Sequence, residues 1–148
     1  MTEPREEVFG NPKGWVAKHI ADYLDPGTKR GYRFGGWDTL LITTRGRHSG
    51  RLRRTALAYG EDDGRYVVVG SNGGAPNHPD WYLNLVARPE VRIRVREEEF
   101  SATARDATPA ERPRLWELMV SINPSYEEYQ RRADRSRRTI PVVVLERS

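Results

Sequence analysis

Residues 40–59 read LLITTRGRHSGRLRRTALAY, and this stretch decides the fold that we predict for the chain. Apolar and β-branched residues fill its first five and last five positions, a pattern typical of two β-strands. Between them, Gly46 and Gly50 bracket a turn that carries arginines, a histidine and a serine. Such a turn can present backbone N–H groups, a hydroxyl and guanidinium groups to one anion. A solvated hairpin loop would explain the same composition, so the residues alone leave both interpretations open.

The sequence on either side of this stretch predicts further strands and a few helices. In chain order we expect a helix over 12–24, strands over 38–45, 54–60 and 65–71, a short helix ending near 87, strands over 91–96 and 99–106, a helix after 108, a second helix over 124–130 and a strand over 139–146. Consecutive strands joined by hairpins form antiparallel sheets, and about six such strands commonly curl into a barrel. The predicted fold class is therefore mainly β with flanking helices, as a six-stranded antiparallel barrel.

Local signals support several of these elements. The segment 91–96 alternates strictly between apolar residues and arginine, which indicates a half-buried strand. Val67-Val68-Val69 is a continuous apolar run, which indicates a strand buried on both faces. Thr108-Pro109-Ala110-Glu111 has the pattern of a capping box at a helix start.

Length and composition limit the classes of protein that fit. The 148 residues suit one domain, which we place at 11–148 after a flexible tail at 1–10. The sequence contains no cysteine, and its three histidines are far apart, so we expect neither disulfides nor a metal site. The first residues are charged and no long apolar run follows, which indicates a cytoplasmic protein. Peripheral contact with the inner face of the cell membrane stays open, as does the oligomeric state.

The chain is basic, with a net charge of +4 and a pI of about 9.6. Nucleic acid is the usual alternative for a basic domain. The arginines here are mixed with acidic residues along the chain, and no known nucleic-acid motif is present. We therefore expect a small-molecule partner and no nucleic acid.

Two further segments combine residues suited to ligand binding. Residues 71–84, SNGGAPNHPDWYLN, follow a predicted buried strand and lead through a Gly-Gly turn into a helix. Strand, turn and helix start can place backbone donors around a ligand, although a plain connector has the same pattern. Tyr126 and Tyr129 lie three residues apart and so share one helix face. Two phenols there can stack on a flat ligand and donate protons, or can simply cover a helix face.

Taken together, these segments resemble the deazaflavin-dependent nitroreductase family of actinobacterial oxidoreductases. The resemblance covers about residues 35–146 and keeps the order and spacing of the motifs. The matching segments are 40–50 (LLITTRGRHSG), 70–75 (GSNGGA), 78–85 (HPDWYLNL), 103–108 (TARDAT), 124–130 (PSYEEYQ) and 140–145 (IPVVVL). It implies a split β-barrel related to flavin-binding barrels, and as cofactor coenzyme F-420, an 8-hydroxy-5-deazaflavin with a phosphate and an oligoglutamate tail.

The resemblance also implies roles for individual residues. Arg47, His48, Ser49 and Arg53 should hold the phosphate and the nearby tail. The ring system should be lined from one side by Val69, Gly70, Ser71, Asn72, Gly73 and Gly74, and closed on the other by Asp80, Trp81, Tyr82, Leu83 and Asn84. Tyr126 should lie over the ring near the substrate, with Tyr129 close by. Ser71, Tyr126 and Tyr129 are the predicted catalytic residues.

Three positions depart from the family pattern. His48 and Asn72 stand where the family often has lysine, and Asn123 stands where a tyrosine precedes Pro-Ser-Tyr in the nitroimidazole-reducing member. A histidine makes phosphate binding more dependent on pH than a lysine does. The missing phenol puts the activation of bulky bicyclic nitroimidazoles in question without touching the cofactor site.

The leading interpretation is an enzyme, a reductase that passes a hydride from reduced coenzyme F-420 to an electron-poor acceptor such as a quinone, an enone or a nitroaromatic compound. Ser71 or Tyr126 would meet the charge that develops on the acceptor oxygen. The alternatives are a non-enzymatic carrier of the deazaflavin, an FMN-binding split-barrel reductase, and an arginine-rich nucleic-acid module. Purified protein coloured yellow by a fluorescent flavin would identify the FMN enzyme, and a steep salt dependence of DNA or RNA binding would identify the module.

Overall fold

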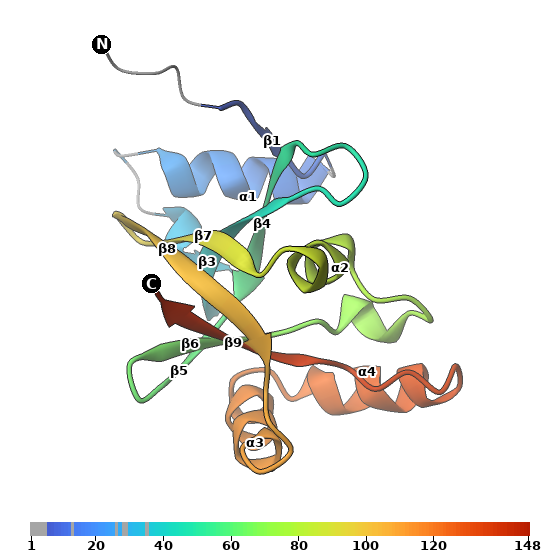
Figure 1. Ribbon diagram of the computed structural model, residues 1–148. Helices are drawn as coiled ribbons and strands as arrows, with labels where there is room; N and C mark the ends of the chain where they lie inside the picture. The colour runs from blue at the N-terminus through green and yellow to red at the C-terminus, as the bar shows by residue number, and fades with distance from the viewer. Residues whose placement is uncertain (1–5, 13, 26, 28–29, 35) are drawn as a thin grey trace.

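The computed structural model describes residues 6–12, 14–25, 27, 30–34 and 36–148, which form one bent sheet with helices around it (Figure 1). Along the sheet, neighbouring strands are β1 (Val8–Gly10), β4 (Leu52–Ala58), β3 (Trp37–Arg45), β7 (Glu90–Val95), β8 (Glu98–Asp106), β9 (Val142–Arg147), β6 (Arg65–Val69) and β5 (Gly60–Asp62). The short β2 (Arg33–Phe34) pairs with β3 beside this path. The helices are α1 (Gly14–Leu24), α2 (Asp80–Ala87), α3 (Arg112–Ile122) and α4 (Ser125–Asp134), with single 3₁₀ turns η1 (Arg30–Tyr32) and η2 (Asn72–Gly74).

The six predicted strands are all present, and they are consecutive neighbours in the sheet. The series β4-β3-β7-β8-β9-β6 is antiparallel throughout. The expectation of six strands in a purely antiparallel sheet was wrong in two respects: the short strands β1, β2 and β5 add to the sheet, and β1 pairs with β4 in parallel. Among the described residues, β1 and β5 at the two ends of the path do not pair with each other, so the sheet is not closed. The mainly β class with flanking helices is confirmed, and the six-stranded barrel is not.

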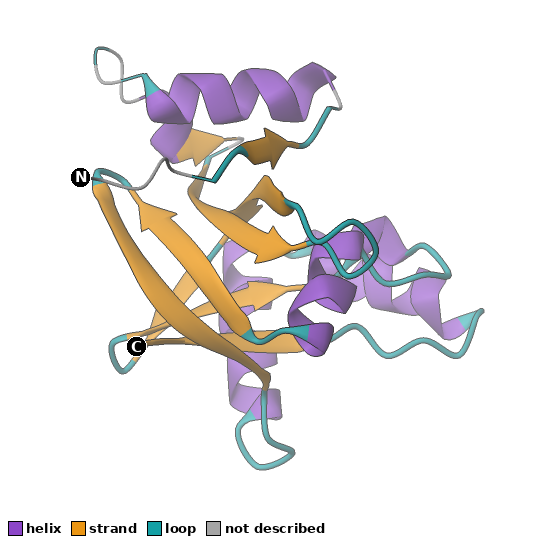
Figure 2. Cartoon of the chain, turned by 45° about the horizontal axis from the view of Figure 1, so that its top comes forward, coloured by secondary structure: helices purple, strands orange, loops and turns teal. Residues whose placement is uncertain are grey.

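The sheet bends strongly around an apolar interior (Figure 2). Side chains from β3, β6, β7, β8 and β9 meet those of α2 in one buried cluster. A second cluster lies between the other face of β6 and β9 and the helices α3 and α4. Val68 belongs to the first cluster, while Val67 and Val69 belong to the second, and all three are at most 5% exposed. Burial of this strand on both faces, predicted from its continuous apolar run, is therefore confirmed.

Helix starts and turns follow the sequence signals with small shifts. The capping box forms, because the Thr108 N–H donates to Glu111 Oε1 at 2.9 Å and the Glu111 N–H donates to Thr108 Oγ1 at 3.3 Å. The α-helix itself begins only at Arg112. Between the strands predicted over 54–60 and 65–71, residues 60–62 form the short strand β5, and the turn that joins β5 to β6 is Asp63-Gly64, both at positive φ.

The first ten residues are not all a tail. Val8–Gly10 forms β1, and its residues lie opposite Leu52–Arg54 at the edge of β4. The sequence pattern missed this strand because three residues are too few to show periodicity. Residues 1–5 of the expected tail lie outside the described residues.

The segments singled out in the sequence gather on one side of the sheet. The loop between β3 and β4, the helix α2 and the turn η2 all lie at the right of Figure 1, with α4 below them. Among the described helices, none is long and apolar enough to cross a membrane. The described residues also contain no cluster of side chains suited to hold a metal ion.

Candidate active site

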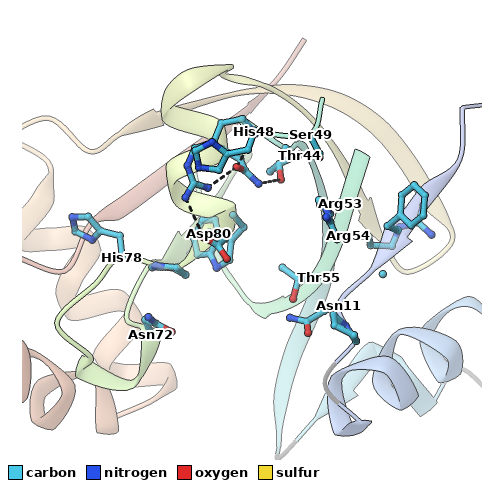
Figure 3. Close-up of a pocket in the computed structure, with 18 of the residues that line it drawn as sticks. Asn11, Thr44, His48, Ser49, Arg53, Arg54, Thr55, Asn72, His78 and Asp80 are labelled. Atoms are coloured by element: carbon cyan, nitrogen blue, oxygen red, sulfur yellow. Dashed lines mark hydrogen bonds and ion pairs between the residues drawn. The ribbon is translucent and has the colours of Figure 1, made fainter. Parts of the chain in front are cut away.

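A cavity of about 730 Å³ opens between the β3–β4 loop, β1, η2 and the start of α2 (Figure 3). This volume lies within the usual range for small-molecule sites. Its walls are formed by Phe9, Gly10, Asn11, Pro12, Thr44, Gly46, Arg47, His48, Ser49, Arg53, Arg54, Thr55, Asn72, Asn77, His78, Pro79, Asp80, Trp81 and Asn84. The lining thus combines aromatic and proline side chains with polar and charged groups, which suits a ligand that is flat in one part and charged in another.

Asn84 fixes the β3–β4 loop against α2. Its side chain is 4% exposed, and its Oδ1 accepts hydrogen bonds from the Arg47 N–H at 3.1 Å and from Arg47 Nη1 at 2.9 Å. The Asn84 Nδ2 group donates to Thr44 Oγ1 at 3.4 Å, and Arg47 Nη2 pairs with Asp80 Oδ1 at 3.2 Å. The loop and the helix start therefore reach the cavity in one defined arrangement.

The turn inside this loop is closed by its own backbone. The Gly46 N–H donates to the Arg51 carbonyl at 2.7 Å, and the Gly50 N–H donates to the Gly46 carbonyl at 2.8 Å. Gly50 has a φ of +71°, a region that suits glycine. A side chain at Gly46 would meet Ser49 Oγ at 2.7 Å, so the approach of that hydroxyl requires a glycine there.

The cavity has an excess of positive charge. Three arginines line it against a single carboxylate, that of Asp80, which already pairs with Arg47. Among the described residues, Arg53 and Arg54 have no carboxylate within 4 Å; Arg53 lies over the Phe9 ring, and Arg54 donates to Thr43 Oγ1 at 3.4 Å. Burial lowers the pKa of Arg54 from its usual value, which means that its charge is held partly away from water. An anionic ligand would relieve this excess.

The structure brings together about half of the residues predicted for the site. Arg47, His48, Ser49, Arg53, Asn72, Asp80, Trp81 and Asn84 all line the cavity. Val69, Gly70, Ser71, Gly73, Gly74, Tyr82, Leu83, Tyr126 and Tyr129 are not among the lining residues of this cavity. Tyr82 turns into the core, where its hydroxyl donates to Asp106 at 2.9 Å and burial raises its pKa to about 12. The roles assigned to this second group stay predictions.

Tyr126 and Tyr129 share a face of α4, as expected, with ring centroids 6.2 Å apart. Tyr126 is 6% exposed and packs near Trp116, in the cluster between the sheet and the helices α3 and α4. Burial raises the pKa of Tyr126 to about 12, against a smaller opposing effect of its side-chain hydrogen bond with Asn123. The phenol therefore stays protonated at neutral pH and can donate a proton but not accept one.

The turn η2 connects α4 to the cavity. Asn72 and Gly74 have positive φ angles, and a side chain at Gly74 would meet the Tyr129 carbonyl oxygen at 2.5 Å. Asn72, which lines the cavity, donates from its side chain to the Asn77 carbonyl at 2.9 Å. The backbone of α4 at Tyr129 thus lies directly behind a segment whose other side forms a wall of the cavity.

Sequence reasoning missed several residues of the wall. Phe9, Asn11 and Pro12 come from the segment around β1, which no sequence pattern connected to the site. Arg54 and Thr55 follow the loop directly, and the basic run from Arg51 to Arg54 was a signal that could have included Arg54. His78 belonged to a quoted motif but received no role, although it lines the cavity.

The sequence model of one family, the F420H(2)-dependent quinone reductases, matches residues 15–147. A protein described as the F420H(2)-dependent quinone reductase Rv1261c of Mycobacterium tuberculosis (strain H37Rv) is 38% identical over 146 residues, which cover 90% of this chain and 96% of that protein. The chain belongs to this family. The predicted resemblance to deazaflavin-dependent oxidoreductases is thereby confirmed, and of the three acceptor classes expected, the family is named for quinones. As a member, the protein is an oxidoreductase that depends on reduced coenzyme F-420.

Two solved structures are similar to this chain in both sequence and fold. A structure described as the F420-H2-dependent reductase FDR-A is 39% identical, covers 73% of this chain and 93% of its own, and superposes with a TM-score of 0.65. Another, described as a domain-swapped dimer, is 36% identical, covers 92% of this chain and 100% of its own, and has a TM-score of 0.69.

Proposed function

We propose that the protein reduces a quinone with reduced coenzyme F-420 bound in the cavity beside the β3–β4 loop. The observation that carries this proposal is the excess of guanidinium groups in a cavity whose remaining walls are partly aromatic. When bound, the deazaflavin supplies a hydride as a two-electron carrier. The protein's contribution is to hold the coenzyme, to exclude water and to position the acceptor.

The β3–β4 loop binds the anionic part of the coenzyme in this proposal. Arg53 and Arg54 have no carboxylate partner within reach in the described structure, so they offer guanidinium groups to a phosphate or to glutamate carboxylates. Arg47 is held by Asn84 and Asp80, which orient it before any ligand arrives. His48 and Ser49 lie beside it on the same wall. Pre-orientation of this kind lowers the entropy that binding costs.

The flat part of the coenzyme fits the side of the cavity formed by α2 and η2. Trp81 and Pro79 at the start of α2 supply apolar surface there, and Asn72 supplies a polar group from η2. In this arrangement the segment from Val69 to Gly74 runs behind the ring system. The acceptor then enters beside α4 at the edge of this segment, because Gly74 packs directly against α4.

A hydrogen-bond donor must meet the negative charge that develops on the acceptor oxygen. We assign this task to the Ser71 hydroxyl and to the Tyr126 phenol, which a pKa of about 12 keeps protonated. In this proposal Tyr126, which is 6% exposed, meets an acceptor that enters beside α4. The half-buried Tyr129 completes this face of the helix.

The proposal extends to the fold and to the place where the enzyme works. The six antiparallel strands bend around one apolar cluster, and we assign this arrangement to the split-barrel class. Trp15 on α1 is 62% exposed, which supports peripheral contact with the inner face of the cell membrane, where lipophilic quinones dissolve. Sedimentation with lipid vesicles tests that contact by comparing the wild type with Trp15→Ser.

The decisive experiment combines the protein with reduced coenzyme and menadione under anaerobic conditions. We expect the visible absorbance of the oxidised coenzyme to return much faster than in the protein-free control. Tight coenzyme binding without turnover of menadione, other quinones or enones would instead indicate a carrier. Protein that purifies yellow with bound flavin would indicate an FMN enzyme.

A further inference from the structure

Arg138, in the connection between α4 and β9, is the one buried arginine among the described residues, at 7% exposure. It donates from Nε to the Ala75 carbonyl at 2.8 Å, from Nη1 to the Gly70 carbonyl at 3.1 Å, and from Nη2 to the Ser71 carbonyl at 2.5 Å. A further hydrogen bond joins Nη1 to His78 Nδ1 at 2.9 Å. These contacts use four of the five N–H groups that a guanidinium offers.

All four partners belong to one segment, residues 70–78. This segment starts at the end of β6, contains η2 and ends just before α2. Asn72, Asn77 and His78 within it line the cavity, and Asn72 and His78 are seen on the left of Figure 3. The Arg138 side chain is far from this segment in sequence and hydrogen-bonds to both ends of it. It therefore holds together the wall against which we place the deazaflavin ring.

The backbone of Arg138 is itself held by α4. Gln130 donates from Nε2 to the Arg138 carbonyl at 3.0 Å and accepts at Oε1 from the Ile140 N–H at 2.9 Å. The Arg138 N–H donates to the Ala133 carbonyl at 3.0 Å. Gly74 packs against the same helix, so α4 supports the segment both directly and through Arg138.

The contact with His78 also selects the state of that imidazole. A guanidinium N–H donates, so Nδ1 must accept, and the ring is neutral with its proton on Nε2. Other groups near the ring are the Tyr82 ring of α2, at 4.9 Å between centroids, and the Asp106 carboxylate of β8. Burial is the largest cause that lowers the pKa of His78, and the positive charge of Arg138 is the second. The Asp106 carboxylate acts in the opposite direction. His78 is thus kept as a neutral donor in the cavity wall.

We propose that Arg138 is a positioning residue that holds the 70–78 segment in its coenzyme-binding form and keeps the His78 imidazole neutral. This inference rests on the function proposed above. It assigns Arg138 no contact with coenzyme or acceptor, because the residue acts through the carbonyls of Gly70 and Ser71 and through His78. It also distinguishes Arg138 from the exposed arginines that precede it in the basic stretch from Arg131.

The test uses Arg138→Gln and Arg138→Lys, with Arg135→Gln as the control. Arg135 is exposed at the end of α4 and loses the same charge in the substitution. For Arg138→Gln, in folded protein, we expect coenzyme Kd to rise about tenfold and kcat to fall by about 10- to 100-fold, since small misplacements at a reacting site have effects of this size. Arg138→Lys should behave similarly, because an ammonium cannot reproduce the planar fork. For the control Arg135→Gln we expect coenzyme Kd and kcat to stay within about twofold of the wild type, because this side chain positions no group of the site.

A second readout needs no coenzyme. The pKa of His78, followed by NMR of its ring and assigned with His78→Gln, should rise towards 6.5 in Arg138→Gln and stay low in Arg135→Gln. The proposal is overturned if folded Arg138→Gln binds and turns over as the wild type does, if Arg138→Lys restores full activity, or if the His78 titration is unchanged. Failure of the wild type to bind coenzyme would overturn the proposed function instead, while the NMR titration would still decide the contact between Arg138 and His78.

Discussion

Asn84 offers the most direct test of how the site is built, because one buried amide connects α2 to the β3–β4 loop. Asn84→Leu keeps a side chain of similar size but leaves the Arg47 N–H and Arg47 Nη1 without their acceptor. A neutral hydrogen bond contributes about 1 kcal/mol to stability, and one from a charged donor about 1.5–3 kcal/mol. The Arg47 side chain is 26% exposed, so water replaces part of the second bond. We therefore expect the free energy of unfolding to fall by about 2–3 kcal/mol.

Urea denaturation followed by tryptophan fluorescence measures this loss, and coenzyme titration measures its consequence for binding. A double-mutant cycle with Arg47→Ala isolates the side-chain bond from Arg47 Nη1, because alanine keeps the backbone N–H and its bond to Asn84 Oδ1. If Asn84 acts through Arg47, the two effects are non-additive, with a coupling energy of about 1–2 kcal/mol. Additive effects, or an Asn84→Leu protein as stable as the wild type, would refute the reasoning.

Four further predictions address the binding loop, the turn, the phenol and the capping box. Arg53→Gln should raise coenzyme Kd about tenfold in a calorimetric titration, because one charge-assisted bond is worth about 1.5 kcal/mol. Arg51→Gln, at a residue outside the cavity, should leave Kd near the wild-type value, and equal effects of the two substitutions would contradict a specific role for Arg53. Gly74→Ala should lower stability by about 2–4 kcal/mol in thermal unfolding, since its φ is +81° and the added carbon meets backbone, and a mild effect would mean that α4 does not support η2. Tyr126→Phe should lower kcat about 100-fold with unchanged coenzyme Kd, and an unchanged kcat in this variant would remove Tyr126 from the mechanism. Because the pKa of Tyr126 is about 12, the pH profile of the wild-type kcat should show no ionisation of this residue up to about pH 10. The Arg105 guanidinium and the Thr108 N–H lower the pKa of Glu111 to about 2 from 4.5, so the stabilising effect of its carboxylate is present above pH 4.5 and is lost as the pH falls towards 2. The thermal midpoint of Glu111→Gln should therefore fall less over that range than that of the wild type, and parallel curves would show that the carboxylate does not contribute to stability.

Local patterns in the sequence predicted most of the sheet. The alternation in 91–96 and the apolar run at 67–69 became β7 and the doubly buried β6, because side-chain period and burial are properties of a short segment. The short β1 was missed, because a strand of three residues is stabilised by its partner β4 rather than by its own pattern. Strand order was also beyond local reasoning: β3 pairs with β7 across nearly fifty residues of chain.

The candidate site was predicted where ligand-binding groups lie close together in sequence. One cavity is lined by Gly46, Arg47, His48, Ser49 and Arg53 of the loop together with Asp80, Trp81 and Asn84. The sequence could not show that Asn84 is the anchor of Arg47, because thirty-seven residues separate them. Arg138 was hidden for a different reason: in the sequence it is one arginine among several in a basic stretch, and only its burial against residues 70–78 separates it from them.

The parallel pairing of β1 with β4 has a practical consequence for handling the protein. A shortened chain beginning at Pro12 would lack Phe9, over which Arg51 and Arg53 lie, and would leave the long edge of β4 uncovered. Uncovered edges recruit strands from other molecules and promote aggregation. The C-terminal strand β9 lies between β8 and β6, yet its last residue is at the surface, so a purification tag is better attached at Ser148 than in place of the first residues.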